Sequence, residues 1–390
     1  WLKAHGSIKH LAVHSSSYVL IICQWMLHTM RHIVLLSSMA AGASACSNFY
    51  MNYTNPDYRL SGRSEDMAYM AADVIHSFPR GRVASPPNST TWTAKYGFVG
   101  FCGPQDPFVD DPKDNIYDGL NEMGLSCSSL TMFGTKYAKH PGADPTRNLY
   151  APFMCRWVLE NFATVEEAKA TLAGMHVFAR PGGMKEHFYL ADEHRHGLVV
   201  EFMDGKVQLT LDMNDGGKTG LGIFTNSPPF GWQLQAIKHF EWKRSLAKSS
   251  VAIPGTFYPD DRFLRMYLFR EAIESGAQPM SYREAVARVV SILNTVAVPP
   301  GGLSGTGGLG DHSKWQVVRD HKNRKVYWRA LDSPSLQLID LKKLAFAPGS
   351  PVTTLSSEIP DTVWYRDVTS QMISKFEHSQ QHASNTPMMV

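Results

Sequence analysis

The segment in front of Cys46 has the organisation of a secretory leader, and it decides which part of the chain has to fold. Met30-Arg31-His32 is a short positive start, residues 33–41 are mostly apolar, and Ala43-Ser44-Ala45 is a small-residue cleavage pattern. We therefore predict that residues 1–45 are a leader that is removed, and that the protein is secreted or periplasmic. A buried N-terminal helix is the alternative. Residues 18–27 are too short a run to span a membrane, which takes about twenty apolar residues.

Cleavage after Ala45 would make Cys46 the first residue of the mature chain. Cys46 would then carry a nucleophilic thiol and an α-amine, whose ordinary pKa of about 8 leaves part of it unprotonated near neutral pH. One residue would supply both the nucleophile and the general base of an acyl-transfer reaction. A lipid-anchored cysteine is the alternative, and it is disfavoured by Ala43, where a lipoprotein signal usually has Leu.

Charge and composition favour a compact domain that acts on a small molecule. The chain has 38 Lys and Arg against 35 Asp and Glu. Lys3, Lys9 and Arg31 lie in the leader, which has no acidic residue, so the mature chain has 38 − 3 = 35 basic residues and a net charge of 0. This balance does not indicate nucleic acid or a membrane surface as a partner. Hydrophobic residues make up 43% of the chain, which is enough for a large core.

The mature chain alternates strand-like runs with helices, which indicates an α+β layered architecture. Residues 154–161 are predicted to be helical, and Thr164…Glu167 and Ser281…Glu284 are capping boxes that open helices towards Met175 and Asn294. Strands are predicted at 96–102, 124–130, 188–191, 198–202, 207–211, 222–225, 315–319 and 325–329, with hairpin loops at 192–197 and 320–324. We predict one domain over residues 46–346 and a loosely ordered C-terminal extension over residues 347–390.

The remaining cysteines and the histidine-rich turn are given structural interpretations. Four cysteines follow the leader, too few for a disulfide framework at this length, so Cys102, Cys127 and Cys155 are expected to be buried apolar residues. The run Asp192-Glu-His-Arg-His196 falls in a predicted hairpin turn and does not supply convergent metal ligands. We expect no metal and no cofactor.

Several segments occur in an order typical of one enzyme family. They are Cys46-Ser-Asn-Phe, Leu60-Ser-Gly-Arg63-Ser-Glu-Asp66-Met, Asp118-Gly-Leu-Asn-Glu-Met-Gly-Leu125, Leu221-Gly-Ile-Phe-Thr-Asn226-Ser-Pro, Pro254-Gly-Thr-Phe-Tyr-Pro-Asp-Asp-Arg262-Phe-Leu-Arg and Lys314-Trp-Gln-Val-Val-Arg-Asp. Together they cover roughly residues 46–344 and resemble the choloylglycine hydrolase family, which contains penicillin V acylases and conjugated bile salt hydrolases. The resemblance implies the N-terminal nucleophile hydrolase fold, a four-layer αββα sandwich. It also implies a tetramer as a possible homo-oligomer.

The implied activity is hydrolysis of a linear amide C–N bond in an N-acylated small molecule. Substrates of the penicillin V, conjugated bile salt or N-acyl homoserine lactone type are expected. Two other functions stay open. One is a lipid amidase of the N-acylethanolamine or ceramide type, and the other is a secreted relative that binds ligand without catalysis.

The chemistry requires a nucleophile, a base and donors for the negative oxygen that forms on the attacked carbonyl. Cys46 supplies the nucleophile and the base, Asp66 is placed to hold the α-amine, and Arg63 puts positive charge near the sulfur. Asn226 offers a side-chain NH₂ to the oxyanion. The resemblance assigns these roles to the same positions and adds Arg262 beside the nucleophile. Taken singly, Arg63 and Asp66 would be a surface ion pair, Asn226 a turn residue and Arg262 part of a solvated charge cluster.

Two positions depart from the family pattern and bear on the substrate. Thr131 stands where bile salt hydrolases usually have Asn and one type of penicillin acylase has Tyr, and the resemblance implies that its backbone N–H serves the oxyanion. Glu65 stands where bacterial relatives usually have an apolar residue near the acyl pocket. We therefore expect Glu65 to disfavour anionic substrates and to tolerate neutral or aromatic acyl groups.

Overall fold

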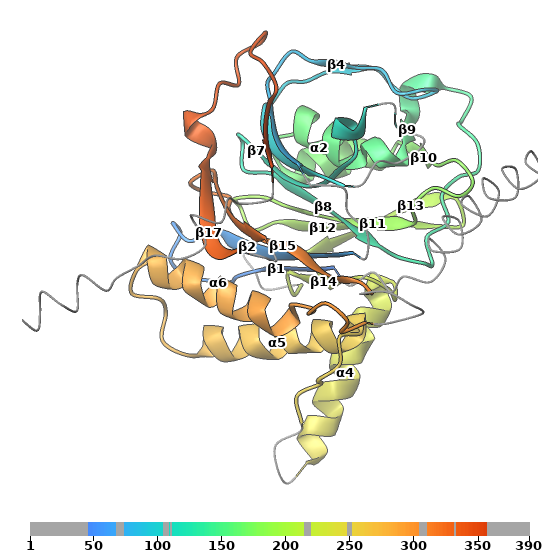
Figure 1. Ribbon diagram of the computed structural model, residues 1–390. Helices are drawn as coiled ribbons and strands as arrows, with labels where there is room; N and C mark the ends of the chain where they lie inside the picture. The colour runs from blue at the N-terminus through green and yellow to red at the C-terminus, as the bar shows by residue number, and fades with distance from the viewer. Residues whose placement is uncertain are drawn as a thin grey trace, which may run out of the picture.

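The computed structural model describes residues 46–67, 74–103, 109, 111–213, 220–247, 252–303, 310–330 and 333–356. In these residues two β-sheets lie face to face, and helices cover the outer side of each sheet (Figure 1). This is the predicted four-layer αββα sandwich. The predicted leader lies outside the described residues. None of the described helices is long and apolar enough to cross a membrane.

The six-stranded sheet contains the segment that begins at Cys46. Its order is β14-β1-β2-β15-β16-β17, with antiparallel neighbours throughout. The strands are β1 (Ser47–Tyr50), β2 (Leu60–Met67), β14 (Ile223–Thr225), β15 (His312–Asp320), β16 (Lys325–Ala330) and β17 (Ser333–Asp340). Every residue of β1 is buried. Cys46 therefore lies inside the sandwich rather than at its surface.

The eight-stranded sheet has the order β13-β12-β11-β8-β7-β6-β3-β18 and is also antiparallel. Its strands are β3 (Val74–Phe78), β6 (Phe98–Cys102), β7 (Ile116–Asn121), β8 (Ser126–Thr131), β11 (Glu186–Ala191), β12 (Gly197–Met203), β13 (Lys206–Asp212) and β18 (Thr353–Ser356). Two short pairs lie beside it: β4 (Val83–Ala84) with β5 (Trp92–Thr93), and β9 (Asn148–Tyr150) with β10 (His176–Phe178).

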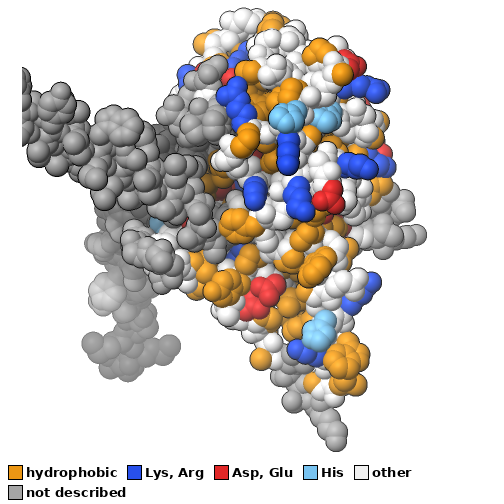
Figure 2. Space-filling view, turned by 90° about the vertical axis from the view of Figure 1, so that its right-hand side faces the viewer, with side chains coloured by type: hydrophobic (Ala, Val, Ile, Leu, Met, Phe, Trp, Pro, Cys, Tyr) orange, Lys and Arg blue, Asp and Glu red, His pale blue; other side chains and the backbone are white. Residues whose placement is uncertain are grey.

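Helices form the outer layers and enclose separate apolar cores. The helices α2 (Met154–Asn161) and α3 (Val165–Leu172) lie on the eight-stranded sheet, and α5 (Pro259–Ser275) and α6 (Tyr282–Val296) lie on the six-stranded sheet (Figure 1). The helix α4 (Phe230–Leu246) extends away from the layers. Its projecting part carries apolar side chains at the surface (Figure 2), and Trp242 and Leu246 are both more than half exposed.

The local signals in the sequence predict several elements correctly. The hydroxyl of Thr164 accepts a hydrogen bond from the backbone N–H of Glu167, and Ser281 does the same for Glu284. The helices α3 and α6 begin directly after these capping residues, although α3 ends at Leu172 rather than near Met175. The eight predicted strands and both hairpin loops are also present.

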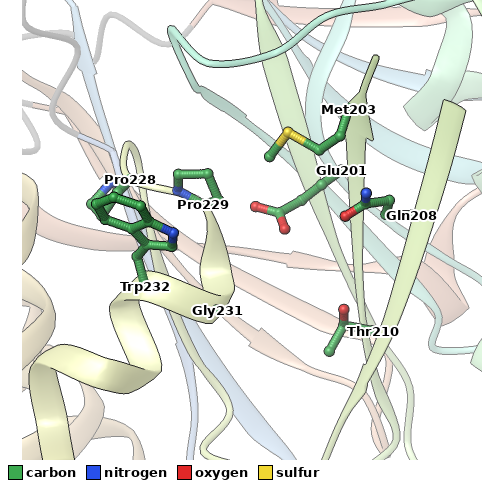
Figure 3. Close-up of a pocket in the computed structure, with 8 residues that line it drawn as sticks. All are labelled: Glu201, Met203, Gln208, Thr210, Pro228, Pro229, Gly231 and Trp232. Carbon is green, nitrogen blue, oxygen red and sulfur yellow. The ribbon is translucent and has the colours of Figure 1, made fainter. Parts of the chain in front are cut away.

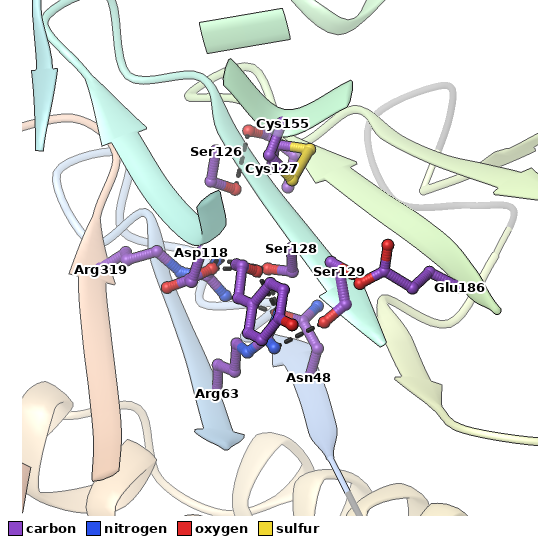
Figure 4. Close-up of a disulfide and its surroundings, with 12 residues drawn as sticks. Asn48, Arg63, Asp118, Ser126, Cys127, Ser128, Ser129, Cys155, Glu186 and Arg319 are labelled. Atoms are coloured by element: carbon purple, nitrogen blue, oxygen red, sulfur yellow. Dashed lines mark hydrogen bonds and ion pairs between the residues drawn. A yellow bond between two sulfur atoms is a disulfide. The ribbon is translucent and has the colours of Figure 1, made fainter. Parts of the chain in front are cut away.

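The prediction for the cysteines was partly wrong. Cys127 on β8 and Cys155 on α2 form a disulfide, with Cα atoms 5.3 Å apart (Figure 4). Counting cysteines could not show that α2 packs on the neighbouring strand. Cys102 is buried as expected. In the predicted C-terminal extension, residues 353–356 form β18, which pairs with β3, and residues 357–390 lie outside the described residues.

Candidate active site

Sheet pairing brings the predicted site residues to Cys46. Its side chain is buried, and its thiol donates to the backbone carbonyl of Asp66 at a sulfur–oxygen distance of 4.0 Å. Ser47, the next residue, pairs with Ser64 of β2 on one side and with Thr225 of β14 on the other. The segment 63–66 and the end of β14 therefore flank Cys46, although they are far apart in sequence.

The carboxylate of Asp66 is buried, and its two oxygens differ in their hydrogen bonds. Its Oδ1 accepts hydrogen bonds from the hydroxyls of Ser64 (2.7 Å) and Ser313. Within the described residues its Oδ2 has no hydrogen-bond partner. Burial raises the pKa of Asp66 to about 7, and the positive charge of Arg262 opposes this rise. Asp66 is therefore a buried carboxylate that can still accept a hydrogen bond, and not half of a surface ion pair.

Arg262 joins the nucleophile to Asn226. Its Nη1 donates to the carbonyl of Cys46 (2.6 Å) and to the hydroxyl of Ser47 (2.5 Å), and its Nη2 donates to Oδ1 of Asn226 (3.0 Å). The side chain is fully buried, and this burial lowers the pKa of the guanidinium to about 10. The alternative of a solvated charge cluster is thus excluded for Arg262.

The side-chain amide of Asn226 is fixed at both ends. Its Oδ1 accepts from Arg262, and its Nδ2 donates one hydrogen bond to the carbonyl of Thr131 (3.1 Å). An amide NH₂ carries two hydrogens, so this group can donate more than one hydrogen bond. Gln233 of α4 holds the segment in place, since its Nε2 donates to the backbone carbonyls of Asn226 and Pro228 (2.8 Å each). Gln233 was not predicted, because its helix was missed.

Arg63 and Glu65 share one face of β2, the face turned towards the other sheet, because alternate residues of a strand point the same way. They form a buried ion pair. Arg63 also donates to the carbonyls of Tyr117 (2.9 Å) and Ser129 (2.5 Å), and it lies over the ring of Trp315 (5.6 Å to the centroid). The structure thus holds the guanidinium rigidly between the sheets.

Glu65, which the sequence predicts near the acyl pocket, contacts the nucleophile itself. Its side chain is hydrogen-bonded to the Cys46 thiol as well as to Arg63. Burial raises the pKa of this thiol to about 12, and the negative charge of Glu65 adds to the rise, while Arg63 partly opposes it. With residue 45 still attached, the thiol is therefore protonated at neutral pH and a weak nucleophile.

A polar network between the sheets supports this site (Figure 4). Arg319 donates to Oδ1 of Asp118 (2.6 Å), to the hydroxyl of Ser128 (2.7 Å) and to Oδ1 of Asn48 (2.5 Å). Asn48 lies two residues after Cys46 on β1, so the network fixes the strand that carries the nucleophile. No cluster of possible metal ligands occurs in the described part of the chain.

Comparisons with known proteins give a consistent result. Residues 46–355 match the family model described as linear amide C–N hydrolases, choloylglycine hydrolase family. The chain is 28% identical to the penicillin V acylase of Pectobacterium atrosepticum over 339 residues, which cover 81% of this chain and 86% of that protein. It is 25% identical to the bile salt hydrolase/transferase of Clostridium perfringens over 315 residues, 74% of this chain and 91% of that protein.

Solved structures agree with these relatives. The penicillin V acylase from Agrobacterium tumefaciens superposes with a TM-score of 0.67 and 28% identity, covering 80% of this chain and 91% of that one. A conjugated bile acid hydrolase from Clostridium perfringens superposes with a TM-score of 0.69 over 83% of this chain and 99% of that one. The second match has 22% identity and bears on the fold alone.

Proposed function

This chain belongs to the choloylglycine hydrolase family of linear amide C–N hydrolases, and we propose that it cleaves an N-acylated small molecule with Cys46 as an N-terminal nucleophile. The observation that carries the proposal is the arrangement of Asp66, Asn226 and Arg262 around Cys46. These side chains come from three separate segments and are all buried.

Removal of residues 1–45 would give Cys46 its base. Oδ2 of Asp66 is buried beside Cys46 and has no partner within the described residues, so it can accept a charge-assisted hydrogen bond from the new α-amine. The nearby positive charge of that amine would also favour the ionised carboxylate. The α-amine takes the thiol proton as the sulfur attacks the amide carbonyl carbon, and a tetrahedral oxyanion forms.

The side-chain NH₂ of Asn226 is proposed to stabilise this oxyanion. Arg262 holds the other end of the amide, so the donor is oriented before the substrate binds. The C–N bond then breaks, the leaving nitrogen takes the proton from the α-amine, and the acyl group stays on sulfur. Water attacks this thioester, gives a proton to the α-amine, and releases the carboxylic acid and the thiol.

The structure also supports an oxidising compartment and association of copies. Disulfides persist mainly in secreted or periplasmic proteins, so the Cys127–Cys155 bond supports the proposed secretion together with the leader pattern.

The exposed Trp242 and Leu246 on the projecting part of α4 support the predicted homo-oligomer. Sedimentation of the mature protein would test the second proposal.

The substrate is proposed to carry a neutral acyl group, of the aromatic type found in penicillin V. This proposal rests on the negative charge of Glu65 beside the nucleophile. Arg63 pairs with the same carboxylate and so offsets part of that charge. The test is a panel of penicillin V, taurocholate and an N-acyl homoserine lactone. A clear preference for taurocholate, whose acyl group is neutral but not aromatic, would contradict the aromatic part of the proposal.

The experiment on the nucleophile combines mass spectrometry of the N-terminus with Cys46→Ala and Cys46→Ser. We expect the secreted protein to begin at Cys46, Cys46→Ala to be inactive and Cys46→Ser to retain little activity. Cys102→Ala is the matched control, since Cys102 is also a buried cysteine outside the disulfide. Binding of all three substrates without turnover by the processed wild-type chain would indicate a non-catalytic relative instead.

A further inference from the structure

A buried carboxylate lies apart from the Cys46 site. Glu201 of β12 is 5% exposed. It accepts hydrogen bonds from the backbone N–H of Phe230 (2.9 Å) and from Nδ1 of His187 (3.2 Å). Burial lowers the pKa of His187, so this imidazole is neutral near pH 7. Within the described residues no lysine or arginine lies at ion-pair distance from Glu201.

The carboxylate of Glu201 points into a hollow of about 520 Å³ between β12, β13 and the start of α4 (Figure 3). One wall is formed by Pro228, Pro229 and Trp232, whose indole is 72% exposed. Met203 lies on the side of the strands. None of the residues proposed for catalysis lines this hollow.

We infer that this hollow binds an organic cation, an ammonium group with an apolar or aromatic substituent, between Glu201 and Trp232. A buried charge without a partner is costly, and a bound cation would supply the missing partner. The faces of aromatic rings attract cations, most strongly for Trp, and Met203 with the two prolines provides apolar surface for the substituent. An anion would be repelled by Glu201, and a neutral ligand would leave its charge uncompensated.

This inference does not depend on the role of Cys46. The hollow is, however, connected to the proposed oxyanion donor, because Pro228 and Pro229 follow Asn226 after a single residue. The hydroxyl of that residue, Ser227, accepts a hydrogen bond from the backbone N–H of Phe133 (3.0 Å). A ligand against the two prolines would therefore touch the segment that positions Asn226, while leaving the nucleophile uncovered.

The test uses benzyltrimethylammonium as the probe and the full processed chain as the protein. Calorimetric titration should show saturable binding of this cation, whereas benzoate and benzyl alcohol, which are anionic and neutral, should not bind measurably. Glu201→Gln keeps an acceptor for the N–H of Phe230 and removes the charge, so we expect affinity for the cation to fall at least tenfold.

Trp232→Ala keeps the test decisive if Glu201→Gln fails to fold, because Trp232 is exposed and its loss should leave the fold intact. We expect severalfold weaker binding for Trp232→Ala and no change for Trp242→Ala, an exposed tryptophan on the same helix. Equal binding of the three probes would overturn the inference. Unchanged affinity in Trp232→Ala would also overturn it. So would a titration in which the probe only dissociates an oligomer, because a neighbouring copy would then be the occupant of the hollow.

Discussion

Replacing Glu65 by Gln should make the Cys46 thiol of the processed enzyme more acidic. The two side chains are hydrogen-bonded in a site without solvent, and the negative charge of Glu65 is the largest contribution after burial to the raised pKa of this thiol. Gln keeps the size and a hydrogen-bonding amide but removes the charge. Arg63 would then act on the sulfur without an intervening carboxylate, which favours the thiolate further.

The expected size of the change follows from Coulomb's law. Two unit charges about 4 Å apart interact by about 4 kcal/mol at an effective dielectric constant of about 20, which corresponds to about three pKa units. Arg63 lies against the same carboxylate and cancels part of its field. We therefore expect the thiol pKa to fall by about one to two units, and the thiolate fraction at a fixed lower pH to rise about 10- to 100-fold.

Two assays measure this shift. The ultraviolet absorbance of the thiolate gives the pKa directly, and the rate of alkylation by iodoacetamide should rise about three- to tenfold, because the intrinsic nucleophilicity of a thiolate falls with its pKa. The other charged groups that face Cys46 are Asp66 and Arg262, together with the α-amine, and all of them are unchanged in the variant.

Glu186→Gln is the matched control for this experiment. Glu186 is also buried, but its carboxylate accepts a hydrogen bond from Ser129 rather than from the nucleophile. Its replacement should leave the thiol pKa within a few tenths of a unit. An unchanged or higher thiol pKa in Glu65→Gln would refute the assigned contact between Glu65 and Cys46.

Three further predictions concern other parts of the site and the fold. Asn226→Ala should lower kcat by about 10²- to 10³-fold with a smaller effect on KM, as measured by steady-state kinetics, because it removes an oxyanion donor. In the unprocessed chain, Asp66→Asn should raise the free energy of unfolding at about pH 8 but not at about pH 4. The folded pKa of about 7 lies above the ordinary 3.8, so stability is lost as pH rises through this window. Removing the Cys127–Cys155 bond by replacing both cysteines should lower the free energy of unfolding by about 2–4 kcal/mol, as measured in denaturant titrations.

The residues of the candidate site could be named from the sequence because they lie in short segments that occur in a characteristic order. Cys46, Arg63, Asp66, Asn226 and Arg262 were all named from such segments, and the structure brings them together. Their contacts could not be predicted, since they depend on which strands are neighbours.

Ser313 illustrates this limit. Ser313 donates a hydrogen bond to Asp66 only because β15 pairs with β2.

Glu65 illustrates a second limit, which concerns recognising the strand that carries it. Its direction follows from strand alternation, but residues 60–67 contain so many polar side chains that the pattern of a strand was not recognised. The helix α5 was missed for a related reason, because Arg262 and Arg265 lie on its buried face and disrupt the apolar period.

The most direct test of the mechanism compares two forms of residues 46–390 that differ only in a Met before Cys46. An amide nitrogen is not basic, since its lone pair is delocalised into the carbonyl. We therefore predict negligible turnover of penicillin V while Met is attached, and full activity once it has been removed, with the same fold in both forms. Equal activity of the two forms would contradict the account, because a side chain and not the α-amine of Cys46 would then be the base.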